Sequence, residues 1–421
     1  MSNNQKLQLL VFDSAYTHEM MMQRNLLEFV TSRDLSGFFS HVWSVNPTAS
    51  IVLPVSSPHR YGSPAVQKLN SRHTIIEGKI GKYAKLAWFP AMNFILAQLE
   101  LFWYLYRVAK KNHVTFIRAE DPYYNGMTAV LFSALMKIPL MIGVWGNPGK
   151  IRKFSNRPLM PRLFKWVWLE EKVERFVLRR ADRVMVQNHD NIEFVLQHGV
   201  HQDRTAIFRL GNAIHPLHFK EPSSRKDGTV DLKEMGVTQQ KVLLCISRLE
   251  ALKLTDHVIR VVSLLKAKGW NIKALFVGDG SFRNTMADLA EELDVVDQIV
   301  FCGNQGQEWL ARIIPCASVV LSPLTGRALA EAALGGVPIV AYDVDWHGEL
   351  VETGITGELV PYLQHSLMAD AVERFLNDKE YGKKAGANVR ERALKLMDAC
   401  EIEEAQIAVY EKLLVPMDTK A

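Results

Sequence analysis

The segment Val242–Gly280, VLLCISRLEALKLTDHVIRVVSLLKAKGWNIKALFVGDG, decides the fold. It contains an apolar run at Val242–Ser247, a helical pattern over Asp256–Lys268 and a second apolar run at Ala274–Val277. A short strand, a helix and another short strand are typical of a βαβ unit, because the helix returns the chain to start a parallel neighbour. The segment therefore predicts a parallel sheet with crossover helices, which is an α/β fold.

The same alternation of apolar runs and helical patterns extends along both halves of the chain. In the second half, the expected elements are a helix at Arg283–Leu293 and strands at Ile299–Cys302, Val319–Ser322 and Pro338–Tyr342. In the first half, the expected strands are Leu7–Phe12, Val114–Arg118, Pro139–Val144 and Arg183–Gln187, and the expected helices are Ala91–Lys111 and Tyr124–Met136. Two doubly wound sheets are expected to bind ligands at their strand ends, in a cleft between them.

The length of 421 residues exceeds what one hydrophobic core usually serves, so two domains are expected. The segment Gly211–Gln240 is rich in proline, glycine and polar residues, and it predicts the junction. We expect Rossmann-like domains at residues 1–215 and 216–395. A C-terminal helix within residues 396–421 is expected to pack back on the first domain.

The composition excludes several classes of protein. Hydrophobic residues make up 48% of the chain and charged residues 23%, as in an ordinary globular protein. The four cysteines, Cys245, Cys302, Cys316 and Cys400, show no two-residue spacing, so neither a zinc knuckle nor a redox pair is expected. The first residues, MSNNQKLQLLVFDS, lack a basic segment followed by an apolar one, which predicts a cytosolic chain.

The longest apolar segment is Leu86–Ala109. It contains Asn93, Gln98, Glu100 and Arg107, and a membrane-spanning helix rarely carries such residues near its centre. We therefore expect a buried or half-buried helix here, and a membrane span is the less favoured alternative.

Charge is distributed unevenly along the chain. Residues 1–215 contain 27 Lys and Arg against 15 Asp and Glu, a net charge of +12, and the remainder carries −7. A basic half suits a partner that carries phosphate. Within it, Pro161–Arg180 interleaves tryptophan with arginine and lysine, which predicts a helix on an anionic membrane surface. A packed helix with one charged face is the alternative, and nucleic acid is not expected because no recognition motif accompanies the charge.

Two cations follow the first apolar run of the fold-deciding segment. Arg248 comes directly after the strand Val242–Ser247, and Lys253 follows five residues later. Open α/β sheets bind ligands at the carboxyl ends of their strands, where arginine can hold a phosphate with two hydrogen bonds and lysine adds a compact charge. The pair predicts a site that stabilises a departing diphosphate, and two solvated surface cations are the alternative.

A glycine-rich turn, Gly278-Asp279-Gly280, lies between the next strand and its helix. It matches the first two glycines of the dinucleotide-binding motif G-x-G-x-x-G, but Arg283 stands at the third glycine position. The turn is a candidate for contact with a nucleotide, and a plain strand-to-helix turn is the alternative.

The segment Ser322–Asp343, SPLTGRALAEAALGGVPIVAYD, contains a second candidate phosphate site. Thr325 is a plausible helix N-cap, and Gly326 and Arg327 open the helix, whose free backbone N–H groups attract phosphate. Glu331 lies on this otherwise apolar helix and needs a partner there. The partner of Glu331 could be either the ribose hydroxyls of a ligand or a cation in an internal salt bridge, and the sequence leaves both alternatives open.

The cation pair, the GDG turn, GRALAEAALGGVPIVAYD and TGITGELV, in this order, resemble the family-4 retaining glycosyltransferases of the GT-B fold. The resemblance covers about residues 236–362, and it extends more loosely through EDPYYNG, RRADRVMVQNHDN and FRLGNAIHPLHF. It implies two Rossmann-like domains facing across a cleft, and transfer of a sugar from a nucleotide sugar with retention and without a metal or other cofactor. The implied acceptor is a glycan or a lipid-linked molecule of bacterial-type surface polysaccharide synthesis.

The resemblance also implies roles for individual residues. Arg248 and Lys253 would bind the donor diphosphate, Glu331 would hold the ribose, and the turn Gly278-Asp279-Gly280 and the loop Thr325-Gly326-Arg327 would face the donor. The family usually has a second glutamate eight positions before the ribose-binding one, and this chain has Pro323 there. Thr325 or Arg327 is the candidate substitute for that missing carboxylate.

Departures from the family in the first half define candidates on the acceptor side. Asp13-Ser14-Ala15 follows the first strand, where the family usually has a glycine-rich loop. Glu120-Asp121 stands where a histidine often sits, so both carboxylates are catalytic candidates, and capping of the helix near Pro122 is the alternative. Gly146-Asn147, after the strand Pro139–Val144, is a further candidate for which a plain turn is the alternative.

Asp343-Val344-Asp345 has the spacing of a metal-binding pair, but the resemblance implies a metal-independent reaction, so these are expected to be loop residues. Glu349 weakly resembles a donor-side position, and His347 is expected to be structural. Two rival functions stay open. One is a nucleotide-sugar epimerase of the same fold, which needs no acceptor, and the other is a binding protein that has lost catalysis.

Overall fold

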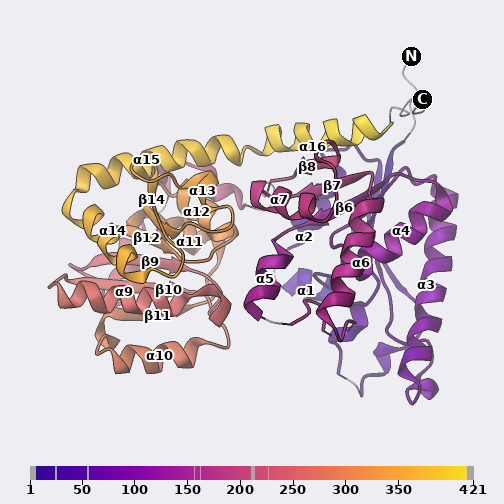
Figure 1. Cartoon of the computed structure of the whole chain (residues 1–421), viewed down its shortest axis with the longest axis horizontal. Helices are drawn as coiled ribbons and strands as arrows, with labels where there is room; N and C mark the ends of the chain where they lie inside the picture. The colour runs from indigo at the N-terminus through magenta and orange to yellow at the C-terminus, as the bar shows by residue number, and fades with distance from the viewer. Residues whose placement is uncertain are drawn as a thin grey trace. The chain divides into compact units, whose positions relative to one another are not determined.

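Figure 1 shows the computed structural model of the chain, which describes residues 6–23, 26–54, 56–155, 157–161, 163–209, 214–225 and 227–414. The chain folds into two compact units. The first consists of Met1–Arg209 with Cys400–Ala421, and the second is Leu210–Ala399. The predicted boundary stood between residues 215 and 216, and residues 211–213 and 226 of the predicted junction lie outside the described residues.

The first unit is built on one sheet, which has eight strands in the described residues. These are β1 (Gln8–Phe12), β2 (His41–Asn46), β3 (Ala65–Lys68), β4 (His73–Glu77), β5 (Phe116–Ala119), β6 (Leu140–Val144), β7 (Arg183–Val186) and β8 (Thr205–Ile207). Their order is β3-β4-β2-β1-β5-β6-β7-β8, and every neighbouring pair is parallel except β3 and β4. The strand order therefore reverses between β1 and β5, which is where a doubly wound sheet binds its ligand.

Helices cover both faces of this sheet (Figure 1). One face carries α3 (Pro90–Asn112), α4 (Tyr124–Met136), α6 (Val167–Arg180) and α7 (His189–Gln197), whose apolar side chains share one core with the strands. On the other face, Tyr410 of α16 (Ala399–Leu414) is buried against Phe39 and Phe116. Residues from Cys400 onward thus belong to the first unit, and the second unit ends at Ala399 instead of residue 395.

The second unit has a six-stranded, wholly parallel sheet. Its strands are β9 (Lys241–Ile246), β10 (Ile272–Val277), β11 (Ile299–Gly303), β12 (Val319–Ser322), β13 (Ile339–Tyr342) and β14 (Gly357–Val360). The order β11-β10-β9-β12-β13-β14 reverses between β9 and β12. One face is covered by α9 (Thr255–Ala267), α10 (Arg283–Glu292) and α14 (His365–Asn377), and the other by α11 (Gln307–Ile313), α12 (Arg327–Leu334) and α15 (Lys379–Leu396).

The prediction of an α/β fold with parallel sheets is confirmed in both units. The expected helix at Leu86–Ala109 is α3, which begins at Pro90 and buries only one of its faces. Among the helices that the structure describes, none is both long enough and apolar enough to cross a membrane.

Candidate functional site

The point where the strand order reverses in the second unit brings the predicted phosphate-binding residues together. Strands β9 and β12 are direct neighbours, with Leu243 paired to Val319 and Leu244 to Val320. Arg248 follows the end of β9, and the loop Thr325-Gly326-Arg327 follows the end of β12. Because the strands are parallel, both loops leave the same edge of the sheet, although about 75 residues separate them along the chain.

Neither cation of this site forms an ion pair in the part of the chain that the structure describes. Arg248 is exposed, and its guanidinium makes no hydrogen bond or ion pair within the described residues. Lys253 is half-buried, and burial together with the charge of Arg248 lowers its pKa, while Asp345 acts in the opposite direction. A partly buried ammonium beside a second cation is an unfavourable arrangement that a bound anion would relieve. This favours an anion site over two solvated surface cations.

The glycine-rich turn supports the loop that carries Arg248. A Cβ at Gly278 would lie 2.0 Å from the carbonyl oxygen of Ser247, and one at Gly280 would lie 2.2 Å from that of Leu249. The absence of side chains lets the turn hydrogen bond to the loop, with Leu249 N donating to Asp279 O at 3.1 Å. The glycines are therefore explained by close backbone packing, and direct contact of Gly278, Asp279 or Gly280 with a ligand stays a prediction.

Replacing Gly280 with alanine is expected to lower the free energy of unfolding by about 1–3 kcal/mol, because the new methyl group would overlap a backbone carbonyl that can move only with the Arg248 loop. Urea unfolding measures the change, and isothermal titration with nucleotide diphosphate measures the accompanying loss of affinity. The control is Gly306→Ala, since nothing lies within 4 Å of a Cβ at Gly306. Equal stability of the two variants would contradict the packing role.

A buried histidine fixes the loop after β12. His347 Nδ1 lies 2.9 Å from the carbonyl oxygen of Tyr342, and its Nε2 lies 3.3 Å from the N–H nitrogen of Thr325 and 3.1 Å from its carbonyl oxygen. Burial lowers the pKa of His347, so the neutral ring donates from Nδ1 to Tyr342 and accepts at Nε2 from Thr325. This geometry gives His347 the structural role that the sequence suggested.

The hydroxyl of Thr325 is a buried group without a partner in the described part of the chain. The prediction that Thr325 is the N-cap of α12 is wrong: the N-cap is Gly326, the helix begins at Arg327, and Thr325 stands one position before the cap. The first N–H groups of a helix are free to bind an anion, and the helix dipole favours negative charge there. An unsatisfied buried hydroxyl beside such a helix start marks a place where a polar ligand can complete the hydrogen bonding.

Glu331 lies inside the same helix and is paired within it. Its Oε1 is 3.0 Å from Nε of Arg327, four residues earlier. Burial raises the pKa of Glu331, and the charge of Arg327 opposes that rise. Of the two partners that the sequence left open, the internal salt bridge is thus present, and a role of Glu331 toward ribose stays a prediction.

The remaining candidates of the second unit lie around this edge. Asp345 has a left-handed backbone conformation (φ 55°) after β13, and its charge opposes the lowering of the Lys253 pKa by burial and by Arg248. Glu349 is on the short helix α13 (His347–Leu350). Within the ranges that the structure describes, no group of three or more His, Cys, Asp or Glu side chains is arranged to hold a metal ion.

In the first unit, the reversal point joins Ser14 to Asp121. Ser14 Oγ donates to Asn125 Oδ1 at 3.0 Å, and Asn125 Nδ2 donates in turn to Asp121. The N–H of Tyr123 donates to the other oxygen of Asp121 at 2.9 Å. Burial raises the pKa of Asp121 to about 6, and the nearby Asp13 adds to the rise, while these hydrogen bonds oppose it. Asp121 is therefore a carboxyl group that titrates close to neutral pH.

Glu120 and Asp13 are held in ion pairs instead. Glu120 Oε1 lies 2.8 Å from Arg118 Nε, and its Oε2 accepts from Trp145 Nε1 at 2.7 Å. Asp13 pairs with the buried Arg33 of η1 (Ser32–Asp34). These contacts stabilise the sheet edge, so of the two neighbouring carboxylates Asp121 is the better candidate for chemistry.

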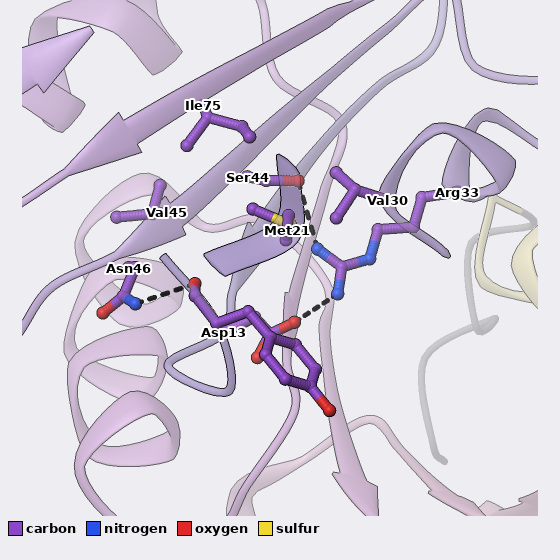
Figure 2. Close-up of a pocket in the computed structure, with 9 residues that line it drawn as sticks. Asp13, Met21, Val30, Arg33, Ser44, Val45, Asn46 and Ile75 are labelled. Carbon is purple, nitrogen blue, oxygen red and sulfur yellow. Dashed lines mark hydrogen bonds and ion pairs between the residues drawn. The ribbon is translucent and has the colours of Figure 1, made fainter. Parts of the chain in front are cut away.

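Figure 2 shows that Arg33 reaches between Asp13 and the hydroxyl of Ser44 in a pocket at the carboxyl ends of β1 and β2. The pocket is lined by Asp13, Tyr16, Met21, Val30, Arg33, Ser44, Val45, Asn46 and Ile75. Arg33 could not be predicted from the sequence, because its partners are distant in the chain.

Gly146-Asn147 follows β6, beside the end of β5. Asn147 Nδ2 donates to Asp190 at 3.1 Å, and Asn147 Oδ1 accepts from the N–H of Lys150 at 3.1 Å, which caps α5 (Pro148–Ser155). These bonds fit the turn alternative, and contact of Gly146 or Asn147 with an acceptor stays a prediction.

Comparison with known proteins shows that the second unit is similar to glycosyltransferases. Residues 232–392 match the family model described as Glycosyl transferases group 1. The chain is 23% identical over 268 residues to alpha-D-kanosaminyltransferase of Streptomyces kanamyceticus, covering 61% of this chain and 66% of that protein. It is 26% identical over 246 residues to N-acetyl-alpha-D-glucosaminyl L-malate synthase of Bacillus anthracis, covering 57% and 62%. The matches thus span just under two thirds of these curated relatives.

Solved structures show the fold of the whole chain. Anabaena Alr3699/HepE in complex with UDP-glucose covers 97% of this chain and 100% of its own, with a TM-score of 0.69 and 16% identity. Sucrose-phosphate synthase from Thermosynechococcus elongatus covers 97% and 99%, with a TM-score of 0.70 and 16% identity. The chain has the GT-B fold, and residues 232–392 of its second unit match the group 1 glycosyltransferase family.

Proposed function

We propose that the chain is a glycosyltransferase that moves a sugar from a nucleotide-sugar donor, bound by the second unit, to an acceptor bound by the first. The observation that carries this proposal is the pair Arg248 and Lys253, which forms no ion pair within the described residues and lies at the reversal point next to the loop before α12. The group 1 domain covers the same residues. A diphosphate at this edge would meet two cations and the start of a helix.

These groups would stabilise the charge that develops on the leaving diphosphate. Arg248 can give two parallel hydrogen bonds to phosphate oxygens, and Lys253 supplies a charge that is strengthened by partial burial. The helix start at Gly326 and the unpaired hydroxyl of Thr325 would add donors from the other side. Such preorganised donors act mainly on the transition state, which is how they raise the rate.

The ribose and the sugar of the donor are proposed to bind at the same edge of the sheet. Glu331 is held by Arg327, and the carboxylate of this pair would accept hydrogen bonds from the ribose hydroxyls. We propose that Thr325 and Arg327 take the place of the glutamate that Pro323 replaces. Retention of the anomeric configuration is proposed from the family-4 resemblance.

The proposed acceptor is a glycan or a lipid-linked molecule, and the proposed setting is the cytoplasmic face of a membrane in surface polysaccharide synthesis. The first unit contains 29 Lys and Arg against 20 Asp and Glu, a net charge of +9, and the second unit contains 21 against 25. Trp166 and Trp168, predicted as membrane-facing, are exposed and stacked 5.9 Å apart, with Lys172 over Trp168. The helix of this segment, α6, begins only at Val167 and packs on the sheet through Val177 and Leu178, as the packed alternative requires, so the exposed tryptophans are what supports the membrane interpretation. Arg162 of the same segment lies outside the described residues.

The experiment that tests the donor site is a thermal-shift panel of nucleotide sugars, followed by an assay of sugar transfer with the donor that binds. A ligand that binds the native state raises the unfolding temperature by mass action. UDP-glucose is the first donor to test, because it is the molecule bound in the HepE structure. Failure of every nucleotide sugar to shift the transition would contradict the proposal.

Asp121 is expected to give the reaction a pH dependence. With its pKa raised to about 6, Asp121 becomes a carboxylate as the pH rises through that value. If the charged form assists the acceptor, kcat/KM rises from about pH 5 to about pH 7. The variant Asp121→Asn should lose this rise, and Asp203→Asn, an exposed residue of the same unit, should keep it. A wild-type profile that is flat over this range would exclude the role.

Turnover is expected to persist without divalent metal, because Arg248, Lys253 and the α12 start can carry the charge stabilisation that a metal would otherwise supply. The measurement compares rates in a chelator and in magnesium or manganese. Loss of turnover in the chelator, restored by either metal, would instead favour Asp343 and Asp345 as ligands.

A further inference from the structure

Helix α3 is apolar on both of its sides. Its buried face repeats every four residues, at Ala97, Leu101, Leu105 and Ala109. Its opposite face is exposed, yet it carries only apolar side chains through the first four turns: Met92, Ile95, Leu96, Leu99 and Trp103. A surface helix of a soluble protein normally presents polar side chains to water, and the exposed face of α3 lacks them over these turns.

The apolar face continues at both edges of the helix. Just before α3, Trp88 and Phe89 are exposed, Trp88 to 89%. Beside it, α4 contains no charged residue over its thirteen positions and exposes Leu131 and Leu135. We call the set Trp88, Phe89, Met92, Ile95, Leu96, Leu99, Trp103, Leu131 and Leu135 the α3–α4 face.

The two helices are fixed side by side. Phe102 of α3 packs edge-on against Phe132 of α4 with ring centroids 5.2 Å apart, and Tyr124 OH donates to Gln98 Oε1 at 2.7 Å. Both helices cover the same face of the sheet, as Figure 1 shows for the first unit. Their outward side chains therefore form one surface, and an exposed apolar surface of this kind marks a binding face.

Basic residues surround the apolar part of α3. The segment 79–111 contains six Lys and Arg: Lys79, Lys82, Lys85, Arg107, Lys110 and Lys111. Its acidic residue is Glu100, which is paired with Lys82 at 2.6 Å. The cations lie before the helix and at its end, and the apolar side chains lie between them. This pattern is complementary to a surface with an apolar interior and anionic head groups.

We infer that the α3–α4 face docks on an anionic lipid bilayer, with α3 lying in the plane of the head groups. A second copy of the chain is a poorer occupant, because it would bring a first unit of the same net charge, +9, against this one. The inference deepens the proposed membrane association by naming its surface, and it rests on the proposed function only for the acceptor found there. No described helix can cross a membrane, so α3 lies on the bilayer and does not span it.

The test is sedimentation with vesicles of phosphatidylglycerol and phosphatidylcholine in equal parts, compared with pure phosphatidylcholine. The double variant Ile95→Ser/Leu99→Ser changes two exposed side chains (57% and 51%) and should bind the anionic vesicles about tenfold more weakly or worse. The matched control is Val230→Ser/Ile355→Ser, which removes similarly exposed side chains (60% and 47%) from the second unit and should bind like the wild type. Wild-type binding should weaken with salt, because salt screens the basic residues.

Equal vesicle binding by Ile95→Ser/Leu99→Ser and Val230→Ser/Ile355→Ser would overturn the inference. So would a loss of vesicle binding in Trp166→Ser/Trp168→Ser while Ile95→Ser/Leu99→Ser binds like the wild type. A wild-type dimer in light scattering that becomes monomeric in Ile95→Ser/Leu99→Ser would also overturn it. Thermal shift with nucleotide sugar is measured on every variant. A normal donor shift with lost vesicle binding supports the docking face, and an absent donor shift in the wild type contradicts the proposed donor site without affecting the vesicle result.

Discussion

Replacing Arg248 with alanine, and Lys253 with alanine in a separate variant, is expected to lower kcat/KM by roughly 30- to 1,000-fold. Each substitution removes a charge-assisted contact to the leaving diphosphate, which contributes about 2–4 kcal/mol to transition-state stabilisation. Both variants should fold normally, because the side chains of Arg248 and Lys253 form no ion pair in the described part of the chain, and Arg248 is exposed.

The control is Lys384→Ala. Lys384 is an exposed cation on helix α15, which does not follow β9 or β12, so its loss should leave kcat/KM unchanged. Steady-state rates with the donor found in the thermal-shift panel measure the effect. Near-normal rates in both Arg248→Ala and Lys253→Ala would rule out the assignment of the diphosphate to this edge.

The second large effect is expected in the first unit, on stability. Arg152 is buried and gives hydrogen bonds of 3.0 and 2.9 Å to the two oxygens of Glu174, whose side chain is fully buried. Tyr123 OH donates to Glu174 at 2.7 Å, and His198 Nε2 lies 2.8 Å from it. Because Tyr123 also donates its N–H to Asp121, this buried cluster fixes the position of the candidate catalytic carboxyl group.

Glu174→Ala is expected to reduce the free energy of unfolding by about 3–5 kcal/mol, because it leaves the guanidinium of Arg152 buried beside one fewer carboxylate. Glu171→Ala is the control: Glu171 is on the same helix and faces the same arginine at 3.6 Å, but its side chain is 46% exposed, so about 0–1 kcal/mol is expected. Urea unfolding gives both values. Similar losses in the two variants would contradict the burial argument.

The effect of Glu174 should depend on pH. Burial alone would raise the pKa of Glu174, but the bonds from His198, Arg152 and Tyr123 outweigh it and lower the pKa. A carboxyl group whose pKa is lowered by folding stabilises the folded state above its unfolded pKa, about 4.3, and loses that contribution as the pH falls below this value. The difference in stability between wild type and Glu174→Gln should therefore shrink toward acid pH.

Continuous burial made some strands predictable from the sequence, but it was not decisive everywhere: the half-buried strand β11 was predicted and the buried strand β4 was not. Strands β9 and β10 are buried along nearly their whole length, so each appears as an uninterrupted apolar run. Strand β3 alternates half-buried and exposed residues and is only four residues long, and it was missed. Strands β2, β4, β8 and β14 were also not predicted.

The residues of the candidate sites also fall into two groups, those that local sequence pattern predicts and those that only tertiary contacts reveal. The sequence predicted which residues follow the strands β9, β12 and β5, because that depends on local pattern alone. It did not predict Arg33 or Asn125, whose contacts with Asp13 and Asp121 depend on how the chain folds back. Nor could it show that Glu120 is held by Arg118 and Trp145 while the neighbouring Asp121 has a pKa raised to about 6.

The sequence by itself determined the α/β class, the two cations after β9 and the helix start after β12, because hydrophobic periodicity and turn residues act over a few neighbouring positions. The tertiary structure alone decided that β9 lies next to β12, which brings Arg248 to the edge where Thr325 lies. It also decided that one apolar side of α3 is buried and the other is exposed. The reason is that burial and charge pairing depend on which distant segments meet, and an apolar pattern does not specify its partner.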